Sequence, residues 1–193
     1  VDAAQPLDGA AARIVALAAA AQRQSAMRSV FGRTRPVTAI DRATGLYGAA
    51  FLRSHLDRLC QRAEAARRPL ALLAARVRDD DRAAALRHLG AYLGVFGQAG
   101  AMIGRLVRAE DVVARLDANL LTIVMAGSTE SAARAVAERI DGVLACTAFD
   151  TGTGVDSAQI SFDFASVARA PGEGAGVLLA RVRSLLEQSS PAA

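Results

Sequence analysis

The segment from Arg108 to Met125 constrains the fold more than any other part of the chain. Two apolar arms, Val112 to Leu116 and Leu120 to Met125, flank the polar residues Asp117 to Asn119. Apolar arms separated by a short polar turn are typical of a β-hairpin. The corner Arg108-Ala-Glu-Asp111 leads into the first arm. We therefore expect a hairpin with a basic and an acidic residue, three apart, at its entrance.

Length and composition favour one folded domain of ordinary size. The chain has 193 residues, of which 52% are hydrophobic and 22% are charged, and this excludes a disordered chain. Its apolar runs are shorter than the roughly 18 residues that span a bilayer, so no membrane insertion of this segment is expected. The chain begins at Val1 without an initiator Met, which predicts a piece of a longer protein or a processed product.

The charged and polar residues exclude several functional classes. All 23 basic residues are arginine, which removes Schiff-base chemistry and the lysine of P-loop proteins. The net charge is +4, but the arginines are spread along the chain, so no nucleic-acid partner is expected. Cys60 and Cys146 are far apart, and neither His55 nor His88 has a clustered partner. We predict two buried, reduced thiols in a cytoplasmic protein and no metal site.

Hydrophobic periodicity divides the chain into an N-terminal segment, 1–38, and a domain, 39–190. The first segment predicts a connecting helix over 10–30, either half of a dimeric coiled stalk or a helix packed on its own domain. Repeated glycines in the long second helix of the domain mark close packing or a break near Gly97–Gly100. The order is α-β-α-β-β-α-β-β-α, which predicts an α+β sandwich with helices packed on a central sheet. The domain pattern predicts, in order, helix 47–67, strand 70–77, a helix from 79–81 to about 106, hairpin 111–125, helix 129–144, strands near 146–149 and 158–167, and helix 174–187.

Several motifs resemble the GGDEF (diguanylate cyclase) family. Asp41-Arg-Ala-Thr-Gly-Leu46 resembles the family's opening Asp-x-Leu-Thr-Gly-Leu, and Ala137-Glu-Arg-Ile140 resembles its Ala-Glu-Arg-Ile after the hairpin. Arg108-Ala-Glu-Asp111 has the position of the family's inhibitory-site Arg-x-x-Asp, ahead of the Gly-Gly-Asp/Glu-Glu-Phe turn. The resemblance covers residues 41 to about 167. It implies a nucleotide-cyclase-like fold, a central and mostly antiparallel sheet flanked by helices, with an N-terminal connecting helix.

The positions that carry catalysis in the family are changed here. The signature turn reads Asp117-Ala118-Asn119-Leu120-Leu121, so its two glycines are lost and an amide replaces a metal-holding carboxylate. Arg76 stands where the family has its Mg²⁺-binding carboxylate at the end of the first strand. Phosphoryl transfer depends on metal and electrostatic positioning. We therefore expect no cyclase activity, no catalytic residue and no metal or other cofactor.

The retained corner is suited to guanine. An Arg fork pairs with N7 and O6, and a carboxylate accepts from the N1–H and N2–H donors, which are the roles expected of Arg108 and Asp111. Arg139 falls where the family supplies a second arginine for phosphate. We predict a degenerate GGDEF domain that binds cyclic di-GMP at Arg108, Asp111 and Arg139. Its partner would be a second copy in a homodimer or another signalling protein.

Alternative interpretations stay open. Arg-x-x-Asp also occurs at Arg76/Asp79 and Arg78/Asp81, so a solvated surface ion pair is the structural alternative at the corner. A nucleotide-independent dimerisation or docking module would keep the fold and bind no ligand. Residual mononucleotide binding at the old turn is a third possibility, but the bulk of Leu120 and Leu121 and the lost glycines argue against it.

Overall fold

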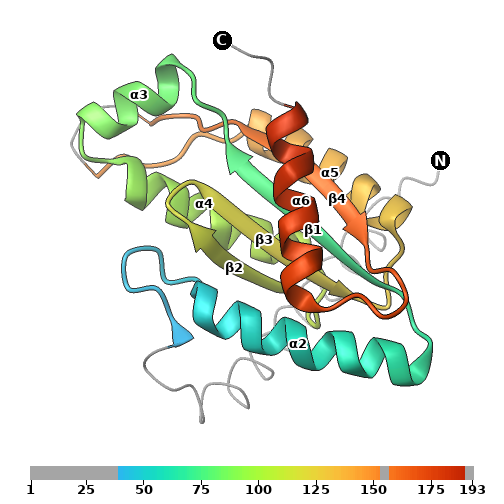
Figure 1. The fold of residues 1–193 in the computed structure, drawn as a ribbon. Coiled ribbons are helices and arrows are strands. Elements are labelled where there is room, and N and C mark those ends of the chain that lie inside the picture. Colours follow the sequence, from blue (N-terminus) through green and yellow to red (C-terminus); the bar gives the residue numbers. More distant parts are fainter. Residues whose placement is uncertain (1–38, 153–156, 190–193) are drawn as a thin grey trace, which may run out of the picture. The chain divides into compact units, whose positions relative to one another are not determined.

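The computed structural model describes residues 39–152 and 157–189, which all belong to the compact unit Thr38–Ala193. The helix predicted over 10–30 lies outside the described residues. The elements, labelled in Figure 1, are α2 (Ala49–Ala66), β1 (Leu70–Val77), α3 (Asp81–His88), α4 (Tyr92–Leu106), β2 (Val112–Asp117), β3 (Leu120–Ala126), α5 (Glu130–Ala145), β4 (Phe162–Ala168) and α6 (Ala175–Ser189).

The strands form a four-stranded antiparallel sheet in the order β2-β3-β1-β4. β1 is central, and its continuous apolar run is explained by burial on both faces of the sheet. Leu72 of β1 lies opposite Val124 of β3 on one side and Val167 of β4 on the other. The predicted α+β class, with helices flanking an antiparallel sheet, is confirmed.

Helices cover both faces of this sheet. α3, α4 and α5 enclose one core layer around Leu73, Phe96 and Ile123, whereas α2 and α6 enclose the other around Leu56 and Leu72. Figure 1 shows α6 lying across one face, with α4 and α5 behind the strands. Because side chains alternate along a strand, the neighbours Leu72 and Leu73 enter opposite layers.

Polar caps begin two of the helices. The Asp80 carboxylate accepts a hydrogen bond from the Ala83 N–H at 2.9 Å at the start of α3. The Thr129 hydroxyl accepts from the Ala132 N–H at 3.3 Å at the start of α5. Such caps satisfy donors that have no partner inside the helix. The predicted opening of a helix by the acidic run that contains Asp80 is confirmed.

The long helix predicted to reach residue 106 is two helices, and of the two alternatives for Gly97–Gly100 the break was wrong and close packing is confirmed. The chain turns at Gly90, whose φ of 69° is left-handed and suits glycine. Gly97 and Gly100 lie inside α4 and mark close packing instead. A Cβ atom at Gly97 would lie 3.1 Å from the Thr44 carbonyl oxygen.

The strand predicted near 146–149 is also wrong. α5 ends at Ala145, and the Thr147 hydroxyl donates to the Val143 carbonyl at 2.7 Å, which continues the helix end into this segment. Phe149 makes an isolated bridge with Ala158. The last strand runs over Phe162–Ala168, a few residues later than the predicted 158–167.

Two smaller predictions concern thiols and membranes. Cys60 is buried as predicted, but Cys146 is exposed just beyond α5, so the prediction of two buried thiols was wrong. Across the residues that the structure describes, every helix is too short or too polar to cross a membrane.

Candidate functional site

Arg108 and Asp111 form a tight corner between α4 and β2. The Arg108 N–H donates to Asp111 Oδ2 at 3.0 Å, and the Asp111 N–H donates to the Arg108 carbonyl at 3.1 Å. These reciprocal bonds fix the corner through its backbone. Within the described ranges, the exposed Arg108 guanidinium makes no hydrogen bond and no ion pair, not even with Asp111. Its donors are therefore available to a ligand.

Asp111 is half-buried and incompletely satisfied. Its Oδ1 atom is buried and has no hydrogen-bond partner among the residues described. Burial raises the pKa of Asp111, and the hydrogen bond from the Arg108 N–H and the charge of Arg108 only partly oppose this rise. An unpaired buried acceptor costs free energy, so this atom is a candidate to accept a hydrogen bond from a bound molecule.

Arg139 reaches the same corner from α5. Its Nη2 donates to the carbonyl of Leu106, the last residue of α4, at 2.7 Å. Leu106 is two residues before Arg108 in the chain. The structure thus brings the three residues selected from the sequence to one place, although they come from the end of α4, the start of β2 and the side of α5.

The 117–121 turn lies at the other end of β2. Ala118 and Asn119 connect β2 to β3, and Asp117 Oδ1 accepts from the Ala118 N–H at 2.8 Å. Leu120 and Leu121 are buried, with 5% and 0% of their surface exposed. Because these two residues belong to the core, part of the turn is unable to face a ligand.

Two arginines contact the elements around this turn. Arg76, at the end of β1, donates from Nη2 to the Leu186 carbonyl of α6 at 2.6 Å. Arg183 of α6 pairs with Asp117 Oδ2 at 3.5 Å. Sequence reasoning identified Arg76 but missed Arg183, because its contact joins residues 66 positions apart. Guanidinium groups therefore link the ends of β1 and β2 to α6.

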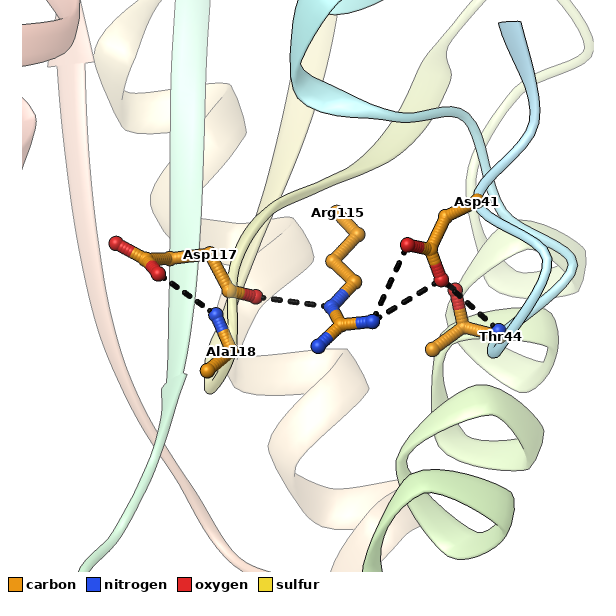
Figure 2. A network of polar contacts seen from close by, with 5 residues as sticks. All are labelled: Asp41, Thr44, Arg115, Asp117 and Ala118. Atoms are coloured by element: carbon orange, nitrogen blue, oxygen red, sulfur yellow. Dashed lines mark hydrogen bonds and ion pairs between the residues drawn. The ribbon is translucent and has the colours of Figure 1, made fainter. Parts of the chain in front are cut away.

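A polar network joins the turn at 41–44 to the hairpin, and Figure 2 shows its residues. Asp41 Oδ1 accepts from the Thr44 N–H at 3.0 Å and from the Thr44 hydroxyl at 2.7 Å. Arg115 Nη1 donates to both Asp41 oxygens at 3.0 and 3.2 Å, and its Nε donates to the Asp117 carbonyl at 3.1 Å. Burial raises the pKa of Asp41, but the hydrogen bonds from Thr44 and Arg115 outweigh this and lower it below 3.8. The sequence signal for this missed network is a single arginine within an apolar strand.

The fold and most of the sequence match a known family. Residues 38–192 match the family described as diguanylate cyclase, GGDEF domain. The chain belongs to the GGDEF family. No curated protein sequence matches it significantly.

Solved GGDEF structures have the same fold at low sequence identity. The GGDEF domain of DgcB from Caulobacter crescentus, in complex with c-di-GMP, has a TM-score of 0.71 at 18% identity, over 81% of this chain and 92% of that one. The FimX GGDEF domain from Pseudomonas aeruginosa has a TM-score of 0.68 at 20% identity, over 79% and 94%. Diguanylate cyclase SiaD from Pseudomonas aeruginosa, in complex with its activator SiaC, has a TM-score of 0.73 at 17% identity, over 94% and 69%. At these identities the similarity concerns the fold.

Arg76 and Asn119 stand where the family resemblance predicts ligands for Mg²⁺. Arg76 presents a cation where an oxygen ligand is needed, and Asn119 offers a neutral amide. In residues 39–152 and 157–189, no three His, Cys, Asp or Glu side chains gather into a metal-binding group.

Proposed function

We propose that this GGDEF domain is a cyclic di-GMP receptor that binds the dinucleotide at Arg108, Asp111 and Arg139 and has no diguanylate cyclase activity. The observation that carries the proposal is the convergence of an unpaired guanidinium, an unpaired carboxylate oxygen and a second arginine at one corner. The complex of the DgcB GGDEF domain with c-di-GMP supports the choice of ligand.

Each residue has a distinct role in this proposal. The Arg108 fork pairs with guanine N7 and O6, and Asp111 accepts from N1–H and N2–H. Asp111 Oδ1 is covered in the free protein, so binding opens the corner enough to expose it. Arg139 lies on the exposed side of α5 and balances phosphate charge. The bound dinucleotide then changes the surface offered to a second copy or to another signalling protein.

The contacts of the old catalytic turn support the absence of cyclase activity. Arg76 and Arg183 bridge the strand ends to α6, and Leu120 is buried in the core. Metal-dependent phosphoryl transfer requires cations at this place, and Arg76 repels them. We expect incubation with GTP and Mg²⁺ or Mn²⁺ to yield no cyclic di-GMP. Formation of cyclic di-GMP would contradict this part of the proposal.

Calorimetric titration with cyclic di-GMP tests the binding site. Replacing Arg108 by Ala removes a bidentate contact and should cost about 1–3 kcal/mol, a roughly five- to 150-fold loss of affinity. Arg105→Ala is the matched control, since Arg105 is an exposed arginine of α4 beside the corner and its loss changes the net charge equally. Equal weakening of affinity in both variants would show that only the net charge matters. Unchanged affinity in Arg108→Ala would show that the dinucleotide does not bind at this corner.

The second candidate function is a docking module that works without nucleotide. The exposed apolar side chains of Val177 and Leu185 on α6, 63% and 37% accessible, favour it. A folded domain that gives no heat with cyclic di-GMP in any variant would select this function over the receptor.

A further inference from the structure

β4 forms an edge of the described sheet, and part of its backbone is unpaired there. The Arg169 N–H donates to the Leu70 carbonyl at 2.8 Å, and the Arg78 N–H donates to the Ser161 carbonyl at 2.9 Å. In an antiparallel pair the bonded residues alternate, so Phe164 and Ser166 direct their N–H and C=O groups away from β1. No other described segment reaches these groups. Edge groups of this kind are a template for an added strand.

A groove of about 450 Å³, with an apolar base and a charged rim, lies beside this edge. The half-buried ring of Phe164 and the buried Leu73 line it from the sheet. Ala137 of α5 lines one side, and Leu185 of α6, which is 37% exposed, lines the other. The groove is therefore placed to receive an apolar side chain from a strand added at β4.

The rim of the groove carries an excess of negative charge. Arg134 pairs with Glu130 at 3.0 Å, whereas Glu138 and Asp141, also on α5, make no ion pair within the described ranges. Two uncompensated carboxylates favour a basic partner. They disfavour a second copy of this chain, because edge-to-edge pairing would bring the same acidic rims together.

We propose that the β4 edge and its groove bind an extended, arginine-bearing segment of a partner protein as an additional strand. The segment's backbone pairs with Phe164 and Ser166, an apolar side chain enters the groove, and an arginine lies against Glu138 or Asp141. Arg181 donates to the Ala168 carbonyl, which closes one end of the edge and keeps the paired stretch short. The site is separate from the Arg108 corner and does not depend on cyclic di-GMP binding.

Selection from a phage-displayed library of random linear peptides, with the full chain as bait and no nucleotide, tests the proposal. The enriched peptides should combine arginine with β-branched or aromatic residues.

Ser166→Pro removes one outward N–H and spares the bonds to β1. It should weaken the binding of a selected peptide by about tenfold, the equivalent of one lost hydrogen bond near 1.4 kcal/mol. Glu138→Arg with Asp141→Arg should weaken it by about fivefold or more. Asp57→Arg on α2 is the control for one such charge reversal and should change little.

Amide hydrogen exchange separates binding from misfolding in these variants. The Phe164 and Ser166 amides should exchange fast in the free chain and slowly with a selected peptide, while the amides that face β1 stay protected throughout. Selected peptides without arginine, or peptides indifferent to Ser166→Pro and to the charge reversals, would overturn the proposal. Protection of both amides in the free chain would also overturn it. If that protection did not depend on protein concentration, the edge would be covered by a segment of the same chain. If it increased with protein concentration, the edge would be covered by a second copy.

Discussion

Arginine is the basic residue throughout this chain, yet its functional meaning differs from position to position. Arg115 and Arg76 use their donors on Asp41 and on the Leu186 carbonyl, so both hold elements together. The Arg139 guanidinium donates one hydrogen bond to the Leu106 carbonyl, and the Arg108 guanidinium donates none within the described residues. Residue type therefore predicts little here, and the corner is distinguished by the second arginine and the unpaired Asp111 Oδ1 beside Arg108.

The ionisation of Asp111 should make cyclic di-GMP binding depend on pH. Burial raises its pKa above 3.8, and the protonated carboxyl loses an acceptor for guanine. Affinity should therefore fall on acidification at a pH above 3.8, which titrations between about pH 4 and pH 7 would detect. Asp111→Asn should bind more weakly and vary little over this range. A wild-type affinity that is constant with pH would argue against a direct contact.

The same shift predicts an effect on folding stability. The pKa of Asp111 is higher in the folded chain than its ordinary value of 3.8. Its contribution to the free energy of unfolding is therefore fully present below pH 3.8 and is lost as the pH rises through the pKa of the folded state. Asp111→Asn should therefore gain stability over the wild type at neutral pH and lose this advantage in acid. Urea unfolding at both ends of the range measures the difference, and a difference of opposite sign would exclude burial as the cause.

Removal of Arg115 should destabilise the domain more than removal of a typical surface arginine. Arg115→Ala leaves the part-buried Asp41 carboxylate without its ion pair and should cost about 1–3 kcal/mol in urea unfolding. Arg134→Ala is the control, since Arg134 is 65% exposed in its pair with Glu130 and should cost under about 1 kcal/mol. Equal costs would show that the network of Figure 2 adds no stability.

At the scale of elements, local signals predicted much of the fold. The continuous apolar run predicted the boundaries of β1, Leu70–Val77. The polar turn residues predicted the hairpin at 112–126. The boundary at Gly90 was missed because the apolar pattern continues through it. The Asp41–Arg115 contact joins positions 74 apart, which no local pattern records. The corner residues were found through a family motif, but their convergence depends on how α5 packs.

The glycines of α4 should respond differently to alanine. Gly94 faces open space, so Gly94→Ala should stabilise the helix by about 0.5–1 kcal/mol. Gly97→Ala places a Cβ atom against the Thr44 backbone, which Asp41 holds in place, and should destabilise by about 1 kcal/mol or more. Thermal unfolding of both variants measures the contrast. Equal stabilisation of the domain by both substitutions would mean that the turn at 41–44 moves easily.

At the scale of the whole domain, two core layers share one sheet. We expect them to unfold together, because β1 contributes alternate side chains to each layer. Leu72→Ala and Leu73→Ala should each cost about 2–5 kcal/mol and preserve a single transition.

The chain's two tyrosines allow this to be measured, since Tyr47 packs against the α2–α6 layer and Tyr92 against the other. Fluorescence of Tyr47→Phe and Tyr92→Phe proteins then reports one layer each during urea unfolding. Coincident curves are the expected result, and separated midpoints would reveal layers that unfold independently.

The contact between Gly97 and the Thr44 backbone connects movements of the turn at 41–44 to the Arg108 corner. Because no side chain lies between Gly97 and Thr44, a displacement of the turn at 41–44 toward α4 presses on the α4 backbone and is not absorbed there by a rotamer change. α4 ends at Leu106, whose carbonyl Arg139 holds, two residues before Arg108. Any coupling along this path is reciprocal: a displacement of the turn would alter the proposed affinity for dinucleotide, and bound dinucleotide would bias the position of the turn by the same free energy.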